Sequence, residues 1–518
     1  MSTNAANPQP NPQEEEEEEP PLFFPQIPGR DIEHELTTSL VFNWFIAWPI
    51  LLITTIVLTI YTSKHTIPYK FIDEIFHISM TERYIQGDWA YWDPKITTPP
   101  GLYYLGFIWS QIGRIVPFVK SDGLIWLRLL NVVGGVVVLP YMLSGMFILN
   151  PIGFWVGSLI MCPILYCFNL VYYTDVWSTV LVVSALSIAV GLPYGDLRSC
   201  QISAGLLWIS LWFRQTNVIW SLFVLVVVIE RRAIIRQNFT DSELNNCIKF
   251  LIQFFEDFWE YTWPFLANVG SFVVFLIYNR GITLGDKENH SVGIHLMQVF
   301  YCFMFFTFLT VPVWFSESYV KWYAYRFKFA WFFVLLEMCL IWLCIRYFLV
   351  VHPFLLADNR HYTFYIFKYF INSPSRWIKY GVMGLVYHFS MFVTYHNLNG
   401  NKFEFSSITD IPFKETRDLP LKPTLITILA LTGCMILTLV PSPLFEPRYY
   451  IVPFFIYRVF ISVPFEEIWG GLGTSNVILK RLYLEFAYLL AFNAFILYVF
   501  IKKEVIWEGV EEIQRIIW

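Results

Sequence analysis

The chain has 518 residues, of which 56% are hydrophobic and 14% charged, and its net charge is −5. A soluble domain carries about 25% charged residues, so this composition excludes an ordinary soluble protein and indicates a membrane protein. Six consecutive glutamates, Glu14 to Glu19, outweigh the net charge. The rest of the chain is therefore close to neutral, which argues against nucleic-acid binding.

The start of the chain differs from the remainder. Asn, Pro, Gln and Glu dominate its first 30 residues, and such a segment cannot bury a core. We expect residues 1–40 to be a disordered acidic tail in the cytosol and residues 41–518 to form one transmembrane domain. Because no basic stretch precedes it, the first apolar segment, Trp44 to Tyr61, is expected to be an uncleaved anchor rather than a signal peptide.

Apolar segments recur along the whole domain, and a membrane-spanning helix needs about 20 of such residues. The fold class we expect is an all-α polytopic membrane protein with 12–13 spans, the smaller number being favoured. The candidate spans are 44–61, 125–148, 152–170, 176–193, 201–213, 218–230, 263–280, 294–313, 329–350, 378–396, 423–441 and 483–501, with 450–463 as the thirteenth.

Basic residues set the expected orientation. Arg231, Arg232 and Arg236 form the clearest basic cluster and are predicted to be cytosolic. Counting back places residues 62–124 on the opposite side, provided that 101–118 lies along the membrane surface. The end of the chain is cytosolic if 450–463 folds back and lies on the opposite side if it crosses; the positive-inside tendency favours the former.

The strongest motif is FIDEIFH at residues 71–77. On a helix Asp73, Glu74 and His77 share one side, because His77 follows them by four and three residues. The ordinary alternative is a solvated helix start, where carboxylates are favoured by the helix dipole. A metal site is disfavoured, because three ligands within one turn have no second cluster to complete them. The scattered cysteines offer no CxxC pair either.

A rigid loop follows, WDPKITTPPGLY at residues 92–103. Its prolines and glycine are explained by backbone geometry alone. Backbone geometry does not explain Trp92 and Asp93. An aromatic ring that can stack on a sugar, next to a carboxylate that can accept its hydrogen bonds, is suited to bind a sugar.

Two later loops combine cations with aromatic residues, HPFLLADNRHY at 352–362 and PLFEPRYY at 443–450. A lone arginine at a membrane surface often only snorkels. Two such loops on the side of the acidic motif favour a phosphate site, because arginine donates in a planar fork. Two polar turns, YYTD at 172–175 and RQTN at 214–217, are expected on the same side.

Together these motifs resemble the endoplasmic-reticulum α-1,2-glucosyltransferases that use dolichyl-phosphate glucose, from about residue 69 to the end of the chain. The resemblance implies a glycosyltransferase-C-type fold with a long first luminal loop at 62–124. It also implies a multi-pass protein of the endoplasmic reticulum with a luminal active site, which adds the last glucose to a diglucosylated dolichyl-diphosphate-linked oligosaccharide. No cofactor, metal or nucleic acid is implied, and a monomer among membrane lipids is the expectation.

The chemistry fits the residues, since a lipid phosphate leaves without a protein acid and only a base and cations are needed. Transfer from a β-linked donor to an α product is a single inverting displacement. Asp73 is the expected base and Glu74 the second choice. Candidate phosphate ligands are Arg360, His361 and Arg448, and candidate sugar or acceptor contacts are His77, Trp92, Asp93, Asp358 and Tyr362.

Three rivals stay open at this point. A dolichyl-phosphate-mannose-dependent transferase is the nearest, because mannose and glucose differ in one hydroxyl's orientation. A transporter would place charged residues inside spans and show internal repeats, whereas the charges here lie mostly in loops. A non-catalytic subunit associated with a channel would tolerate the loss of Asp73.

Overall fold

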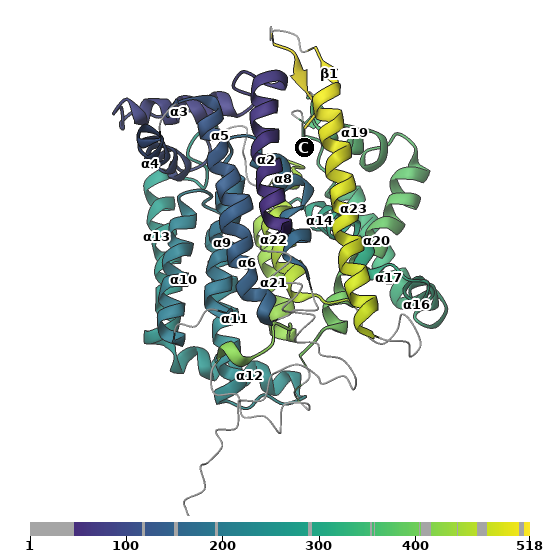
Figure 1. Ribbon diagram of the computed structural model, residues 1–518. Coiled ribbons are helices and arrows are strands. Elements are labelled where there is room, and N and C mark those ends of the chain that lie inside the picture. The colour runs from purple at the N-terminus through teal and green to yellow at the C-terminus, as the bar shows by residue number, and fades with distance from the viewer. Residues whose placement is uncertain are drawn as a thin grey trace, which may run out of the picture. The chain divides into compact units, whose positions relative to one another are not determined.

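The computed structural model describes residues 46–116, 120–149, 154–191, 195–287, 293–352, 355–356, 358–403, 405, 416–442, 444–463, 474–506 and 512–517. The predicted acidic tail, 1–40, lies outside these residues. Residues from Trp48 onward form one compact unit, which is almost entirely helical (Figure 1).

The first half of this unit contains α2 (Trp48–Tyr61), η2 (Thr62–Thr66), α3 (Glu74–Ile85), α4 (Gly101–Ile115), α5 (Leu124–Val132), η3 (Val133–Val138), α6 (Leu139–Leu149), α7 (Val156–Ile160), α8 (Pro163–Asn169), α9 (Thr174–Gly191), α10 (Asp196–Leu211) and α11 (Asn217–Arg236).

The second half contains α12 (Glu243–Glu256), η4 (Phe258–Thr262), α13 (Trp263–Asn279), α14 (Met297–Leu309), α15 (Val311–Trp314), α16 (Glu317–Phe329), α17 (Trp331–Tyr347), α19 (Tyr362–Ile366), η5 (Phe367–Ile371), η6 (Trp377–Val382), α20 (Met383–Gly400), η8 (Thr416–Asp418), α21 (Leu425–Leu439), η9 (Pro447–Tyr450), α22 (Ile451–Phe460) and α23 (Thr474–Lys502). Two short antiparallel strands follow, β1 (Glu504–Val505) and β2 (Gln514–Arg515), with Glu504 opposite Arg515 and Val505 opposite Gln514.

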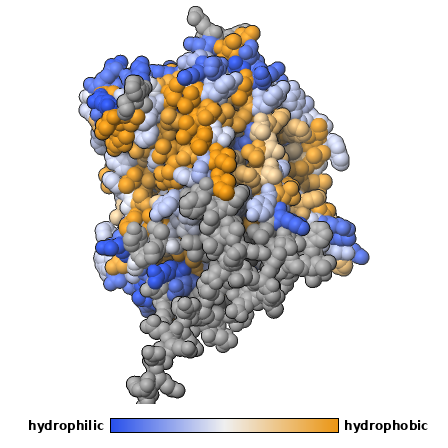
Figure 2. Space-filling view, viewed as in Figure 1, coloured by the Kyte–Doolittle hydropathy of each residue, from blue (hydrophilic) through white to orange (hydrophobic). Residues whose placement is uncertain are grey.

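Several helices have the length and composition of membrane spans. Among the described residues four continuous helical segments meet both criteria, Leu124–Phe147, Thr174–Gly191, Phe258–Asn279 and Lys480–Lys502. The pair α16 and α17, bent by 98°, makes a fifth if it is counted as one span. Hydrophobic residues form a broad band between hydrophilic ends of the visible surface (Figure 2). The chain is therefore an all-α polytopic membrane protein, as predicted.

Other predicted spans coincide with shorter helices. The helices α14 and α21 have 13 and 15 residues, fewer than the roughly 20 that cross a bilayer unaided. The total of 12–13 spans therefore stays a prediction.

The predicted span 152–170 is wrong as a single helix, because the chain there forms the short helices α7 and α8. The break falls before Pro163, which cannot donate to the preceding turn and instead begins α8. The carbonyl oxygen of Met161 accepts a 2.8 Å hydrogen bond from Asn493 Nδ2 on α23. A buried side chain thus satisfies a backbone group that the helix break leaves without a helical partner.

Segment 450–463 connects opposite ends of the unit. At its start Arg448 lies 3.3 Å from Asp73, whereas the carbonyl oxygen of Phe460 accepts a 2.7 Å hydrogen bond from Asn401, beyond the end of α20. All ten residues of α22 are buried, so protein rather than lipid surrounds this short helix. The segment therefore does not fold back to the end where it begins, as the favoured twelve-span alternative assumed.

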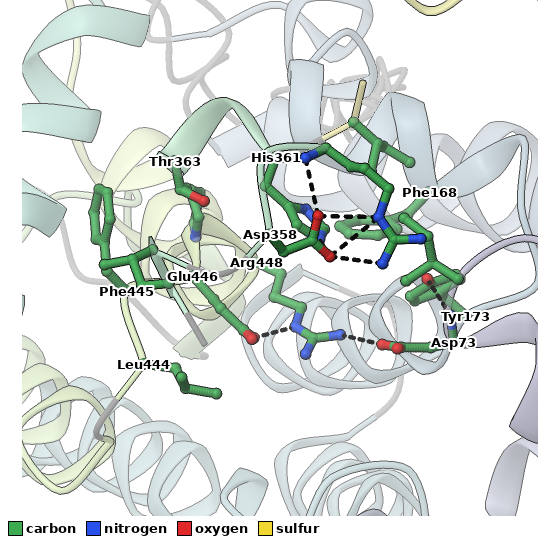
Figure 3. A pocket seen from close by; sticks show the side chains of 15 residues that line it. Asp73, Phe168, Tyr173, Asp358, His361, Thr363, Leu444, Phe445, Glu446 and Arg448 are labelled. Carbon is green, nitrogen blue, oxygen red and sulfur yellow. Dashed lines mark hydrogen bonds and ion pairs between the residues drawn. The ribbon is translucent and has the colours of Figure 1, made fainter. Parts of the chain in front are cut away.

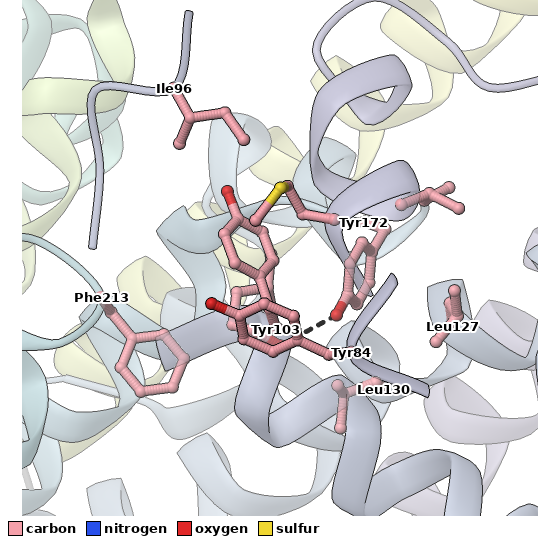
Figure 4. Packing of buried hydrophobic residues seen from close by; sticks show 10 residues of the cluster. Tyr84, Ile96, Tyr103, Leu127, Leu130, Tyr172 and Phe213 are labelled. Atoms are coloured by element: carbon pink, nitrogen blue, oxygen red, sulfur yellow. Dashed lines mark hydrogen bonds between the residues drawn. The ribbon is translucent and has the colours of Figure 1, made fainter. Parts of the chain in front are cut away.

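Helices α3 and α4 lie at one end of the unit, where α3 runs crosswise to α2 and α5 (Figure 1). The predicted helix 101–118 corresponds to α4, which ends at Ile115. Its position depends on Gly101, whose backbone donates a 2.7 Å hydrogen bond to the Trp212 carbonyl and where an added Cβ would lie 2.5 Å from that oxygen. Tyr84 of α3 and Tyr103 of α4 pack with Tyr172 in a buried cluster, in which Tyr172 donates to the Leu102 carbonyl (Figure 4).

Candidate functional site

A cavity of about 250 Å³ opens at the same end of the unit (Figure 3). Segments far apart in the chain contribute its lining, which consists of Ile72, Asp73, Phe168, Tyr173, Leu355, Asp358, Arg360, His361, Thr363, Leu444, Phe445, Glu446, Pro447, Arg448 and Ile517. Five predicted site residues are among them: Asp73, Asp358, Arg360, His361 and Arg448. The structure therefore brings the acidic motif together with both cation-bearing loops.

Asp73 stands directly before α3 and its side chain is 39% exposed, so a ligand in the cavity can reach the carboxylate. The backbone on either side is held firmly. Ile72 has a φ of 48°, a left-handed conformation that is costly for a β-branched residue. The Asp73 amide donates a 3.0 Å hydrogen bond to the Tyr173 hydroxyl. Strain of this kind persists where surrounding contacts over-determine a functional position.

Arg448 joins two carboxylates across the cavity. Its Nη1 lies 3.3 Å from Asp73 Oδ2, and its Nε donates a short hydrogen bond to Glu446 (Figure 3). Although burial opposes it, the charge of Arg448 holds the pKa of the Glu446 carboxyl below its usual value. Pro447 begins the tight turn η9 between them, which lets Glu446 and Arg448 face each other at a separation of two residues.

Arg360 is oriented from its own loop. Its Nε and Nη2 donate to Asp358 at 3.0 Å and 2.7 Å, in a fork. His361 Nε2 lies 3.6 Å from the same carboxylate. Burial raises the pKa of Asp358, but the hydrogen bonds from His361 and Arg360 outweigh it and hold that pKa below its usual value. The predicted phosphate ligands Arg360 and His361 therefore line the cavity, and the Asp358 carboxylate fixes their orientation.

Glu74 does not line the cavity. Its side chain is fully buried and forms an ion pair with Arg128, also fully buried, at 2.6 Å. Its oxygens additionally accept hydrogen bonds from the backbone amides of Phe71, at 2.9 Å, and Tyr172, at 2.7 Å. With the two bonds from Arg128, each carboxylate oxygen of Glu74 accepts two hydrogen bonds, so structural contacts occupy this side chain next to Asp73.

The remaining predicted contacts, His77, Trp92, Asp93 and Tyr362, are not among the residues that line the cavity. His77 is buried, with Nδ1 2.9 Å from the Tyr103 hydroxyl, and burial lowers its pKa to about 4. Trp92 packs against the tyrosine cluster of Figure 4. Asp93 accepts a 2.9 Å hydrogen bond from the Lys95 amide in a local turn. Tyr362 begins α19, and its amide donates to the Ile517 carbonyl at 3.0 Å.

Sequence reasoning missed Arg128, Gln514 and Ile517. Arg128 could have been found from the sequence, because it lies within the predicted span 125–148 and an ionisable residue inside an apolar span usually has a buried partner. Its guanidinium also donates to Ser63 Oγ and to the carbonyl oxygen of Ile67, both at 3.0 Å. The other two residues come from the end of the chain, and no motif there indicated a return to the cavity.

Comparison with known proteins assigns the chain to a family. Residues 67–459 match the sequence profile of the DIE2/ALG10 family. The chain belongs to the DIE2/ALG10 family. The match includes every cavity residue except Ile517.

Several curated relatives carry the name Dol-P-Glc:Glc(2)Man(9)GlcNAc(2)-PP-Dol alpha-1,2-glucosyltransferase. The Candida glabrata protein is 44% identical, over 95% of this chain and 96% of its own length. The Kluyveromyces lactis protein is 42% identical, over 95% and 91% respectively, and the Homo sapiens protein is 28% identical, over 86% and 93%. No solved structure shows a significant match to this member of the DIE2/ALG10 family.

Proposed function

We propose that the chain is an inverting glucosyltransferase. It transfers glucose from dolichyl-phosphate glucose to the diglucosylated dolichyl-diphosphate-linked oligosaccharide through an α-1,2 linkage. The observation that carries the proposal is the meeting of an accessible carboxylate, Asp73, with Arg360 and Arg448 in one cavity. The names of the 44% and 42% identical relatives support the donor, the acceptor and the linkage.

The reaction requires one base. The Asp73 carboxylate accepts the proton of the acceptor hydroxyl as that oxygen attacks the anomeric carbon of glucose. The bond between this carbon and the phosphate oxygen breaks, and its electron pair leaves with dolichyl phosphate. Attack from the face opposite the leaving group inverts the anomeric configuration. General-base assistance of this kind is worth about 100- to 10,000-fold.

Arg448 links the base to the leaving group. In the structure it pairs with Asp73 across 3.3 Å and with Glu446 at closer range. A donor phosphate that takes up Arg448 replaces its long contact with Asp73 and releases that carboxylate to act as a base. Arg360 supplies a second planar donor, and fixed cations of this kind stabilise charge that develops on a leaving phosphate.

The neighbouring residues keep this arrangement in place. Glu74 and Arg128 fix the loop that precedes α3, so that Asp73 faces the cavity. Trp92 and Asp93 lie in the loop before α4, outside the cavity lining, where they are candidates for contacts with the acceptor glycan. In the described part of the chain, Trp92 Nε1 is buried without a hydrogen-bond partner and is suited to donate to a sugar hydroxyl.

The cavity is proposed to face the lumen of the endoplasmic reticulum, within a glycosyltransferase-C-type fold whose first luminal loop is 62–124. The basic cluster at the end of α11, Arg231 to Arg236, supports this orientation, because clusters of Arg and Lys are enriched on the cytosolic side of membrane proteins. No cofactor or metal is required in this mechanism, and one chain contains all the proposed groups.

The decisive experiment is an assay of purified protein with dolichyl-phosphate glucose and dolichyl-phosphate mannose, each offered with the diglucosylated acceptor. We expect an α-1,2-linked triglucosylated product from the glucose donor alone. Transfer from the mannose donor would replace the proposal with its nearest rival. An absence of transfer from either donor by folded protein would favour a non-catalytic role.

A further inference from the structure

We propose that residues 512–517, here called the return segment, line the donor cavity and contribute to donor binding. Gln514 positions the guanidinium of Arg360, and Ile517 closes one side of the cavity. The inference rests on the proposed function and extends it, because it assigns a donor-positioning role to a segment beyond the residues that match the family profile, 67–459.

The return segment is attached to the loop that carries Arg360. The Ile517 amide donates to the Arg360 carbonyl at 2.8 Å, and the Tyr362 amide donates to the Ile517 carbonyl at 3.0 Å. His361 and Ile517 thereby form a parallel bridge. These backbone hydrogen bonds place the Ile517 side chain in the cavity lining, so the return segment supplies part of the cavity's shape.

The other end of the return segment is attached to α23 and to the loop before Asp73. Strand β2 pairs with β1, and Arg515 Nη1 donates to the Ile501 carbonyl at 2.9 Å. The Tyr69 hydroxyl donates a short hydrogen bond to the Ile513 carbonyl. The segment therefore connects the Asp73 loop with the Arg360 loop, which lie almost 300 residues apart in the sequence.

Gln514 helps to hold the guanidinium of Arg360 in one orientation. Asp358 accepts from Nε and Nη2 on one edge of the guanidinium, and Gln514 Oε1 accepts from Nη1 at 2.9 Å. An amide oxygen carries no net charge, so it fixes the orientation of the plane without neutralising the cation. A guanidinium held in this way loses less freedom when it binds phosphate, which favours donor affinity.

The path of α23 places the return segment on the side of Asp73. Near the start of α23, Arg481 donates to carbonyls of the α15 region, including Val313 at 2.9 Å. Near its end, the Phe500 ring lies 5.8 Å from the ring of Phe71, two residues before Asp73. The helix thus returns from the opposite end of the unit to the cavity, so the return segment and Asp73 lie at the same end, whereas the favoured twelve-span alternative placed them on opposite sides.

The test is donor kinetics of Gln514→Leu, which keeps the bulk and removes the acceptor. We expect the KM for dolichyl-phosphate glucose to rise about ten-fold, the loss typical of one hydrogen bond to a charged group, with an unchanged acceptor KM. Ile513→Ala is the matched control: its side chain is 46% exposed in the same segment, and its donor KM should be that of the wild type.

Gln514→Glu is a second variant in case the first does not fold. It keeps the shape but sets another carboxylate against Arg360, so the donor KM must again rise. In an Arg360→Lys background, Gln514→Leu should add almost nothing, since both act through one group.

The outcomes separate the two proposals. If Arg360→Lys raises the donor KM but neither folded Gln514 variant does, the positioning role of the return segment is wrong while the proposed function stands. If Arg360→Lys itself leaves the donor KM unchanged, the phosphate role of Arg360 fails, and Gln514 has nothing to position.

Discussion

Replacing Glu74 by glutamine removes one charge from a fully buried ion pair. The carboxylate accepts hydrogen bonds from Arg128 at 2.9 and 2.6 Å, from the Phe71 amide at 2.9 Å and from the Tyr172 amide at 2.7 Å. A glutamine side chain has one oxygen, so its NH2 group must face two of these donors. Two buried donors without an acceptor cost about 1–3 kcal/mol each, in line with the roughly 3–5 kcal/mol for breaking a buried ion pair.

Glu74→Gln should therefore lower the thermal stability of the purified protein substantially, measured as the folded fraction that remains after heating. Glu82→Gln is the matched control, since Glu82 also lies on α3 but is 37% exposed in its ion pair with Lys70. Exposed pairs contribute at most about 1 kcal/mol, so this variant should stay close to the wild type. A Glu74→Gln protein with wild-type stability and no turnover would refute the positioning role and make Glu74 the base.

Three further predictions concern the phosphate ligands, the pH response and the orientation. Arg360→Lys and Arg448→Lys keep the charge but lose the planar fork, so steady-state assays should show turnover at least about ten-fold lower; near-normal turnover of both would remove them from the site. Burial lowers the pKa of His77 to about 4, so between about pH 4 and pH 6.5 the His77 imidazole binds more protons in the unfolded chain than in the folded protein. Stability should therefore fall as the pH drops through that window, and His77→Gln should weaken this dependence in melting experiments. Of the sequons at Asn238 and Asn289, only Asn289, outside the described residues, should carry glycan by mass spectrometry, and glycan at Asn238 would reverse the orientation.

The sequence was sufficient to predict that Asp73, Arg360 and Arg448 lie together, but not the complete lining of the cavity. Asp73, Arg360 and Arg448 stood out because charged groups in loops of an apolar chain are conspicuous. Their meeting in one cavity followed from placing the loops on one side of the membrane. Helix positions such as α4 followed from apolar runs and from Pro100 and Gly101.

Other features depend on long-range contacts that local patterns do not contain. Adjacent carboxylates look alike in sequence, and only the buried partner Arg128 separates Glu74 from Asp73. The return of residues 512–517 to the cavity depends on the direction of α23. That direction depends in turn on the path of the buried α22, whose ten residues are fewer than the roughly 20 of a membrane span, so hydropathy left the path of 450–463 open. The pattern at 152–170 gave no warning that Pro163 would break the span, although proline often begins a new helix.

The most direct test of the account is the turnover of Asp73→Asn with dolichyl-phosphate glucose and the diglucosylated acceptor. Asparagine keeps the size of the side chain but cannot act as a carboxylate base. The account predicts a loss of at least about 100-fold, with donor binding retained through Arg360 and Arg448. Wild-type turnover of folded Asp73→Asn would contradict the central claim that this carboxylate activates the acceptor hydroxyl.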